Sequence, residues 1–401
     1  MDKLFEIHDD YLALVPMEFT RGLMEKIDWK SRLIAIKGPK GVGKSTLMQQ
    51  YIKRHFAPGD RHVLYCSADT GYFATHTLAE TASHFVKAGG THLFIDEIHK
   101  YNNWSQEIKE IYDLHRGLHI VVSGSSLLQI NDGKSDLSRR MVDYDMPRLS
   151  FREYLWFETG KTVSPVTLAE LLEKPEETCS RIRSIWRPLE FFHRYLKEGY
   201  YPFFFDERPS YRRLVENTVN YIIETELPAC RKLEVGNTRK VKALLQVISN
   251  LVPFQVDISK ISRSIGIERV TTLKYLKYLE EAALISRLYA TADTVSDLQK
   301  PEKILLDNPN LLYVLSNTTP EIGTVRECYF HNQLKGAGHI LNDGGPHSGD
   351  FRIDGKFVIE VGGEEKGFRQ IKDEACGFVA ADGIESAVAH KIPLWAFGFL
   401  Y

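Results

Sequence analysis

The chain has 401 residues, of which 43% are hydrophobic and 26% charged, as is ordinary for a globular protein of two or three domains. A formal net charge of −2 excludes a protein that is basic over its whole surface. No stretch has the roughly 20 apolar residues of a membrane span, the first residues are too acidic for a signal peptide, and the five scattered cysteines form no CxxC pair. We therefore expect a cytoplasmic protein with reduced thiols and no membrane partner.

The first motif follows a short apolar run. Leu33–Ile36 predicts a buried strand, and the residues from Ser45 onward have the spacing of a helix. Between them, GPKGVGKS fits GxxxxGK[ST], a glycine loop whose backbone N–H groups and helix N-terminus can surround a polyphosphate. The predicted nucleotide-binding residues are Gly38, Pro39, Lys40, Gly41, Val42, Gly43, Lys44, Ser45 and Thr46. Lys44 is expected to contact the β- and γ-phosphates and Ser45 to bind Mg²⁺; a glycine turn without a ligand is the alternative.

An acidic pair ends the apolar strand predicted at Leu93–Ile95. Asp96 is expected to hold Mg²⁺ through water, and Glu97 to polarise the attacking water as a general base. A lone Asp-Glu pair after a strand is usually solvated charge. Its distance of about fifty residues from a phosphate loop favours the functional interpretation.

Two further strands are predicted at residues 62–69 and 119–126. Strands that alternate with helices predict a parallel α/β sheet, with the nucleotide at the carboxyl ends of the strands. Ser123 lies at the tip of the later strand, and Ser125 and Ser126 follow it. Ser123 is expected either to sense the γ-phosphate or orient water, or to be part of a plain Ser-Gly turn.

Taken together, these motifs resemble a bacterial and archaeal family of AAA-like P-loop ATPases whose nucleotide domain precedes an uncharacterised C-terminal region. The resemblance covers nearly all of the chain. The segments that carry it are IDWKSRLIAIKGPKGVGKSTL, GGTHLFIDEIHKYNNWSQEIK, VVSGSSLL, PRLSFREYL, YLKEGYYPFF, KPEKILLDNPNLLYVL, GTVRECYFHNQL, FVIEVGG and IPLWAFGFLY. It implies a nucleotide site at Gly38–Thr46 with Asp96 and Glu97, and a sensing residue at Ser123.

The resemblance also implies an arginine finger at Arg140, which would act on a nucleotide phosphate in cis or across the interface of a homo-oligomer. Arg139 stands where the family has glycine, so either arginine fits this role. Two surface arginines in a solvated loop are the alternative.

Residues 151–235 are aromatic and have helical spacing, which indicates a connector that packs between domains. From residue 238 to about 290, a helix, a tight turn at Gly266, a second helix from Arg269 to Ala283 and an apolar strand pair predict a winged helix-turn-helix. In the second helix, the inward residues are expected to be Leu273, Leu276 and Leu279, and the outward or lateral ones Arg269, Thr272, Lys274 and Lys277. Residues 237–290 hold nine Lys or Arg and four Asp or Glu, which suits DNA contact; a lid or a protein contact is the alternative.

The sequence DFRIDGKFVIEVGG, from Asp350 to Gly363, is similar to the metal-binding hairpin of a large nuclease fold. Glu327, Asp350 and Glu360 are the candidate carboxylates, with a turn at Asp354-Gly355 between the two strands. The lysine that stabilises the transition state in that fold is replaced by Gly362. Lys356 and Lys366 are the nearby lysines that could take its place, and we expect a frame that does not cut DNA.

The sequence therefore predicts an α/β protein with four parts: an AAA-like ATP-binding domain at 1–150 with a P-loop parallel sheet, a helical connector at 151–235, a winged helix at 236–300 and a degenerate restriction-endonuclease-like domain at 301–401. The predicted function is an ATPase that uses ATP and Mg²⁺ and couples hydrolysis to a conformational change, with DNA as a partner. An ATP-dependent nuclease, a nucleotide-gated switch with little turnover and a protein-interaction scaffold are the alternatives.

Overall fold

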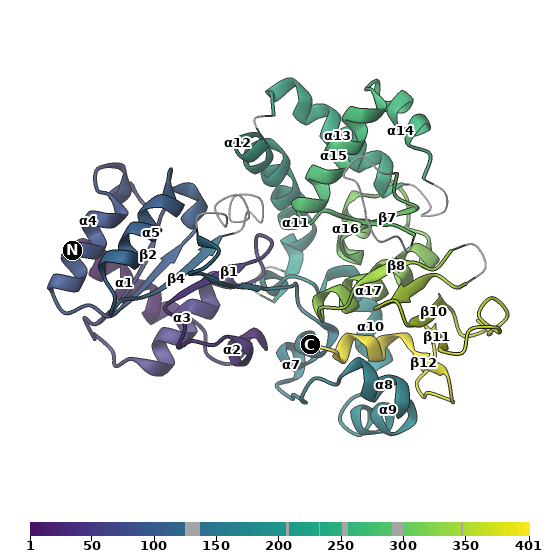
Figure 1. The fold of residues 1–401 in the computed structure, drawn as a ribbon. Helices are drawn as coiled ribbons and strands as arrows, with labels where there is room; N and C mark the ends of the chain where they lie inside the picture. The colour runs from purple at the N-terminus through teal and green to yellow at the C-terminus, as the bar shows by residue number, and fades with distance from the viewer. Residues whose placement is uncertain (125–136, 206–207, 232, 251–255, 291–299, 346–347) are drawn as a thin grey trace. The chain divides into compact units, whose positions relative to one another are not determined.

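The computed structural model describes residues 1–124, 137–205, 208–231, 233–250, 256–290, 300–345 and 348–401 (Figure 1). Two compact units divide the chain, Met1–Pro147 and Arg148–Tyr401. The domain borders predicted inside the second unit stay predictions. Ser125 and Ser126 lie outside the described residues. Among the described residues, no helix combines the length and the apolar character that a membrane span requires.

The first unit alternates helices with strands. Its elements are α1 (Asp2–Leu14), α2 (Leu23–Lys26), β1 (Leu33–Lys37), α3 (Lys44–His55), β2 (Val63–Ser67), α4 (Leu78–Lys87), β3 (His92–Asp96), α5 (Trp104–Leu114), β4 (His119–Gly124) and β5 (Val142–Asp145), with short 3₁₀ turns at Gly71–Ala74 and Ile98–Lys100. The strands have the order β2-β3-β4-β1-β5, and every adjacent pair is parallel. This result confirms the predicted parallel sheet.

Helices cover both faces of this sheet (Figure 1), which explains why the central strands are apolar throughout. Side chains alternate between two cores: Leu33 and Ala35 of β1 pack with α1, α4 and α5, whereas Ile34 and Ile36 pack with α3. Because the strands are parallel, their carboxyl ends share one edge. The loop after β1 therefore lies beside the ends of β4 and β3.

The second unit begins with helices and ends with a mixed sheet. Its elements are α7 (Phe151–Thr159), α8 (Leu168–Glu173), α9 (Pro175–Arg183), α10 (Pro188–Glu198), α11 (Tyr211–Tyr221), α12 (Leu227–Arg231), α13 (Val235–Ser249), α14 (Ile258–Ile265), α15 (Arg269–Glu281), β6 (Ile285–Leu288), β7 (Lys303–Leu306), α16 (Pro309–Leu315), α17 (Ile322–Gly336), β8 (Leu341–Asp343), β9 (Phe351–Ile353), β10 (Phe357–Gly362), β11 (Gly377–Ala381) and β12 (Lys391–Pro393), with a π-helical turn at Ile222–Glu226 and 3₁₀ turns at Pro202–Phe204, Arg208–Ser210 and Leu394–Phe399.

Helices α14 and α15 meet at Gly266, which has φ +66° and ends α14, and an antiparallel pair of β6 and β7 follows α15. Leu273, Leu276 and Leu279 are buried as predicted. The outward position predicted for Thr272 is wrong. Its side chain is fully buried, because the hydroxyl finds partners in the Ser262 hydroxyl (2.8 Å) and the carbonyl of Glu268 (3.1 Å).

The mixed sheet of the second unit has the order β12-β11-β10-β9-β8. Strands β8, β9 and β10 form an antiparallel meander, whereas β10, β11 and β12 are parallel. The turn between β9 and β10 lies at Asp354 and Gly355, as predicted, and both have positive φ, +51° and +69°. Helix α17 packs against β10. Glu327 on the helix and Glu360 on the strand therefore belong to two elements that contact one another.

Candidate functional site

The predicted phosphate loop joins β1 to α3. Gly43 is the residue before the helix and has φ +96°, a left-handed conformation that favours glycine. Lys44, Ser45 and Thr46 lie in the first turn of α3, where backbone N–H groups and the helix dipole favour an anion. The buried Lys44 Nζ donates to the carbonyl oxygens of Gly38 (2.9 Å) and Pro39 (3.0 Å). A polyphosphate would compete with these carbonyls for the same ammonium group.

The loop begins in close contact with the segment that follows β5. The N–H group of Met146 donates to the carbonyl of Lys37 (2.7 Å), so the two backbones run side by side. A Cβ atom at Gly38 would overlap the carbonyl oxygen of Met146. The approach of a second backbone therefore requires glycine at this position.

Asp96 is the last residue of β3, and its buried carboxylate accepts hydrogen bonds from three donors. The hydroxyl of Ser123, on the neighbouring β4, donates to Oδ1, and so does the N–H group of Glu97 (3.0 Å). The hydroxyl of Tyr65, on β2, donates to Oδ2 (2.7 Å). The structure thus brings Asp96 and Ser123 together at the carboxyl edge of the sheet and adds Tyr65, which the sequence analysis missed. These donors fix the orientation of the carboxylate.

Glu97 follows Asp96 with φ +50°, which is uncommon for a residue with a side chain and is typical of functional sites. Its Oε2 lies 3.4 Å from Nε2 of the buried His99. Burial, together with the charges of Lys100 and Lys44, lowers the pKa of His99 to about 4. The imidazole is therefore neutral at neutral pH, so it can orient the Glu97 carboxylate without neutralising it.

Arg21 is a second residue that the sequence analysis missed. Its buried guanidinium donates through Nη1 to the carbonyl of Val42 in the phosphate loop and through Nη2 to the carbonyl of Pro147, both at 2.7 Å. No motif marks this arginine, which precedes β1 by twelve residues. Only its buried position and its two carbonyl partners identify it.

Arg140 lies away from the phosphate loop of its own chain. Its guanidinium forms a two-point ion pair with Asp113 at the end of α5, with distances of 2.9 and 3.0 Å. Arg140 precedes β5, whose first residue, Val142, pairs with Ile34 near the start of β1, whereas the phosphate loop follows the other end of β1. A role for Arg140 at a nucleotide therefore stays a prediction for the site of a neighbouring subunit.

A carboxylate cluster in the second unit consists of Glu327, Asp343, Asp350 and Glu360. Three of these carboxylates surround the ammonium group of Lys303 on β7: Nζ lies 2.8 Å from Oε2 of Glu327, 3.9 Å from Oδ1 of Asp343 and 4.0 Å from Oδ1 of Asp350. Glu327 and Asp350, two of the candidate carboxylates, thus lie beside the same ammonium group. Lys303 was not anticipated, because it lies on a different strand, outside the hairpin motif.

Glu360 pairs with Lys366, one of the two lysines considered from the sequence. Lys366 reaches it across Gly362, where an added Cβ would lie 2.5 Å from the Lys366 side chain. Burial raises the pKa of both Glu327 and Glu360. In the described part of the chain, no group of three or more His, Cys, Asp or Glu side chains has an arrangement that could hold a metal ion.

Comparison with known proteins gives two family matches. Residues 30–155 match the AAA domain, and residues 189–321 match a domain of unknown function, DUF8612. The first match includes the phosphate loop, Asp96, Glu97, Ser123 and Arg140. No curated protein matches the chain.

Three solved structures are similar to the chain at low identity. A Walker-type ATPase of Pyrococcus abyssi is 12% identical, with 74% of this chain and 95% of that chain covered and a TM-score of 0.40. PCH-2 of C. elegans is 14% identical, with 37% and 43% covered and a TM-score of 0.25. Hsp104 of S. cerevisiae in a complex with casein is 16% identical, with 43% and 33% covered and a TM-score of 0.29.

Proposed function

Because residues 30–155 match the AAA domain, we propose that the protein is an Mg²⁺-dependent ATPase. The observation that carries the proposal is the position of Asp96, whose buried carboxylate is fixed by Ser123 and Tyr65 at the sheet edge that also bears the phosphate loop. A rigid carboxylate beside a glycine loop is the arrangement that phosphoryl transfer to water requires.

Each residue of the site then has a role. The loop N–H groups and Lys44 bind the β- and γ-phosphates, and Ser45 with Asp96 would hold Mg²⁺, which neutralises phosphate oxygens when bound. Glu97 accepts a proton from the attacking water, and the neutral His99 keeps its carboxylate in place. Ser123 fixes Asp96 and is proposed to respond to the γ-phosphate.

Replacing Lys44 by alanine is expected to weaken ATP binding about 100-fold, because one or two charge-assisted hydrogen bonds of about 1.5 kcal/mol each are lost. The measurement is the thermal shift that ATP and Mg²⁺ produce across a concentration series. Lys53→Ala, in the last turn of the same helix, is the matched control and should keep the full shift. A wild-type protein without a shift, or a Lys44→Ala protein that keeps it, contradicts the proposal.

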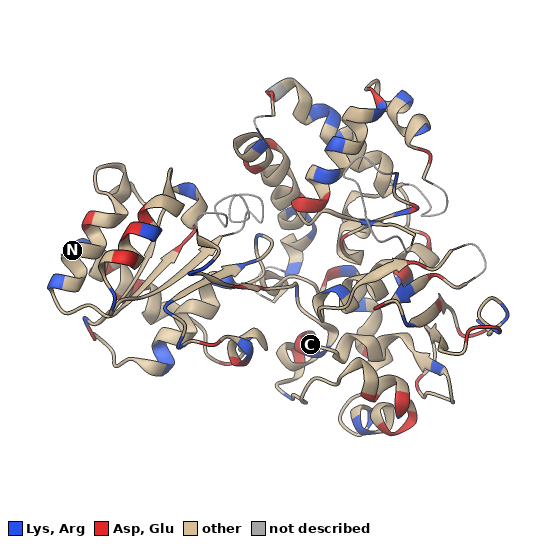
Figure 2. Cartoon of the chain, in the orientation of Figure 1, with Lys and Arg blue, Asp and Glu red and all other residues tan. Residues whose placement is uncertain are grey.

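We also propose double-stranded DNA as a partner of the α14–α15 region. Lys260, Arg263, Arg269 and Lys274 are all exposed there, and Figure 2 shows blue positions along these helices. Lys277 contributes less, because it is half-buried and lies 4.0 Å from Glu281. Exposed cations on a helix pair of this kind suit phosphate contacts. A protein contact is the competing assignment.

The Lys274→Glu substitution is expected to lower the affinity for a DNA duplex about tenfold. The slope of log K against log salt concentration should also fall by about one, the amount that one lost phosphate contact gives. Fluorescence anisotropy at several salt concentrations measures both. Lys161→Glu, at another exposed site of the second unit, is the control and should change neither. No binding by the wild type at low salt would favour the protein contact.

Cleavage of that DNA is not part of the proposed function. The ammonium groups of Lys303 and Lys366 already lie among the four carboxylates of the cluster, so a dication would have to displace an ammonium group that the protein itself supplies. The duplex recovered from the binding reactions after incubation with Mg²⁺ is accordingly expected to be intact.

A further inference from the structure

The side chain of Arg21 joins the last residues of the first unit to the phosphate loop. Arg21 donates one hydrogen bond to the carbonyl of Val42 inside the loop and one to the carbonyl of Pro147, the final residue of the unit. Met146 meets the start of the same loop at Gly38. The segment that leaves the unit therefore contacts the phosphate loop both directly and through Arg21.

The bond to Val42 also sets the direction of a loop donor. A trans peptide unit is planar, so the carbonyl of Val42 and the N–H group of Gly43 point in opposite directions. By holding this carbonyl, Arg21 also fixes the opposite direction of the Gly43 N–H group, one of the loop donors expected to bind a phosphate. Arg21 is thus placed to orient the loop without touching a nucleotide.

The segment before Arg21 is itself held on α3. Gln50 Nε2 donates to the carbonyls of Pro16 and Phe19, both at 2.7 Å, and Lys53 Nζ donates to the carbonyl of Val15 (3.4 Å). The two bonds of Gln50 hold residues 16–19 along the helix that starts at the loop, whereas the long Lys53 contact reaches only Val15, six residues before Arg21. Arg21 consequently has a defined position from which a fork of two donors can reach both carbonyls.

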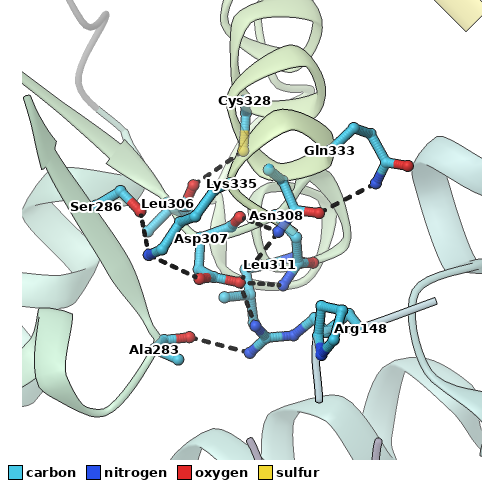
Figure 3. A network of polar contacts seen from close by, with 12 residues as sticks. Arg148, Ala283, Ser286, Leu306, Asp307, Asn308, Leu311, Cys328, Gln333 and Lys335 are labelled. Atoms are coloured by element: carbon cyan, nitrogen blue, oxygen red, sulfur yellow. Dashed lines mark hydrogen bonds and ion pairs between the residues drawn. The ribbon is translucent and has the colours of Figure 1, made fainter. Parts of the chain in front are cut away.

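One peptide bond beyond Pro147, the side chain of Arg148 is buried in a polar network of the second unit (Figure 3). Arg148 pairs with Asp307 at the end of β7 and donates to the carbonyl of Ala283 (3.0 Å) just after α15. Asp307 also lies 3.9 Å from Lys335, which donates to Ser286 on β6 (3.1 Å). Arg148 thus contacts the residues just before β6 and just after β7, which lie at the same end of this antiparallel pair.

We propose that Arg21 is a positioning residue for the phosphate loop, and that the Pro147–Arg148 junction carries the nucleotide state of the loop to the Asp307 network of the second unit. This proposal rests on the proposed ATPase function and deepens it. When a polyphosphate draws Lys44 from the carbonyls of Gly38 and Pro39, the loop backbone must adjust. Because the loop contacts Arg21 and Met146, a change in the loop backbone would also move the backbone at Pro147 and Arg148.

The test uses the full chain and compares wild type with Arg21→Ala, Arg21→Lys and the control Lys53→Ala. We expect Arg21→Ala to raise KM for ATP about tenfold, because the Gly43 N–H group is no longer aimed, and Arg21→Lys to recover only part of this loss, because an ammonium group lacks the planar fork. Lys53→Ala removes a contact with the same segment but leaves the fork intact, so its KM should match wild type.

The second measurement is amide hydrogen exchange of residues 303–315 with and without saturating ATP and Mg²⁺. Wild type and Lys53→Ala are expected to show an ATP-dependent change of at least threefold in exchange rate there, and Arg21→Ala none. Arg21→Ala with an unchanged KM, or with the same exchange response as wild type, overturns the proposal while ATP binding by the wild type still supports the ATPase. Absence of ATP binding by the wild type removes both.

Arg148→Lys tests the other side of the junction. Lysine keeps a charge beside Asp307 but cannot also donate in the same fork to Ala283, so the exchange response should be lost while KM stays within twofold of wild type. Asn332→Asp, which alters a residue that donates to the carbonyl of Asp307 (2.8 Å), serves if Arg148→Lys does not fold. A full response in a folded variant of either kind contradicts transmission through this network.

Discussion

Replacing Glu97 by glutamine is expected to lower the rate of ATP hydrolysis at least about 100-fold while ATP binding is kept, because glutamine has the same shape but cannot accept the proton of the attacking water. The left-handed backbone of Glu97 and its contact with His99 hold the side chain just beyond Asp96 at the sheet edge. The measurements are steady-state phosphate release and ATP affinity on the same preparation.

Glu107→Gln is the matched control for this substitution. Glu107 lies on α5, where its carboxylate accepts hydrogen bonds from Tyr101 (2.8 Å) and from the N–H group of Ala79 (3.0 Å), so it has a structural role and should keep most of the hydrolysis rate. A Glu97→Gln protein that hydrolyses ATP within threefold of wild type would show that Glu97 is not the base. A wild type that binds ATP but releases no phosphate would favour the nucleotide-gated switch.

Replacing Asp307 by alanine is expected to lower the free energy of unfolding of the second unit by about 3–5 kcal/mol. Arg148 and Asp307 are both buried, with side-chain exposures of 3% and 5%, so the substitution leaves a guanidinium in the interior without its counter-charge. Urea denaturation, followed by a signal from the second unit, measures the loss. A ligand-free comparison is required, because bound nucleotide would add its own stabilisation.

Glu170→Ala provides the contrast within the same unit. Glu170 pairs with Arg181 at 2.9 Å, but the two side chains are 37% and 54% exposed, so solvent screens the pair and its loss should cost less than about 1 kcal/mol. Equal losses for Asp307→Ala and Glu170→Ala would mean that the Arg148 network contributes no more than a surface ion pair. That result would also weaken the case for transmission through it.

The parallel sheet and the phosphate loop could be predicted because their signals are local. A buried strand, a glycine loop and a helix follow one another within about twenty residues, and parallel strands then place Asp96 and Ser123 at the same edge. Tyr65 and Arg21 could not be predicted in this way. Each reaches the site from a segment without a motif, and their partners, a carboxylate and backbone carbonyls, are defined only by the packed structure.

The second unit shows the same limit. The spacing of Asp350 and Glu360 correctly indicated a hairpin, because a turn with two positive φ angles fits between them. Lys303 lies outside that spacing, although its ammonium group is central to the cluster. The prediction for Thr272 failed because it placed a polar side chain on the outer face of the helix. A threonine can instead be buried when its hydroxyl donates to a carbonyl of the preceding turn.

The side chain of Lys366 lies over Gly362, so a substitution at either position affects the other. An added Cβ at residue 362 would lie 2.5 Å from the Lys366 side chain, so a Gly362→Lys substitution would displace Lys366 and exchange one cation beside Glu360 for another. The residue at position 362 therefore decides which lysine lies beside Glu360.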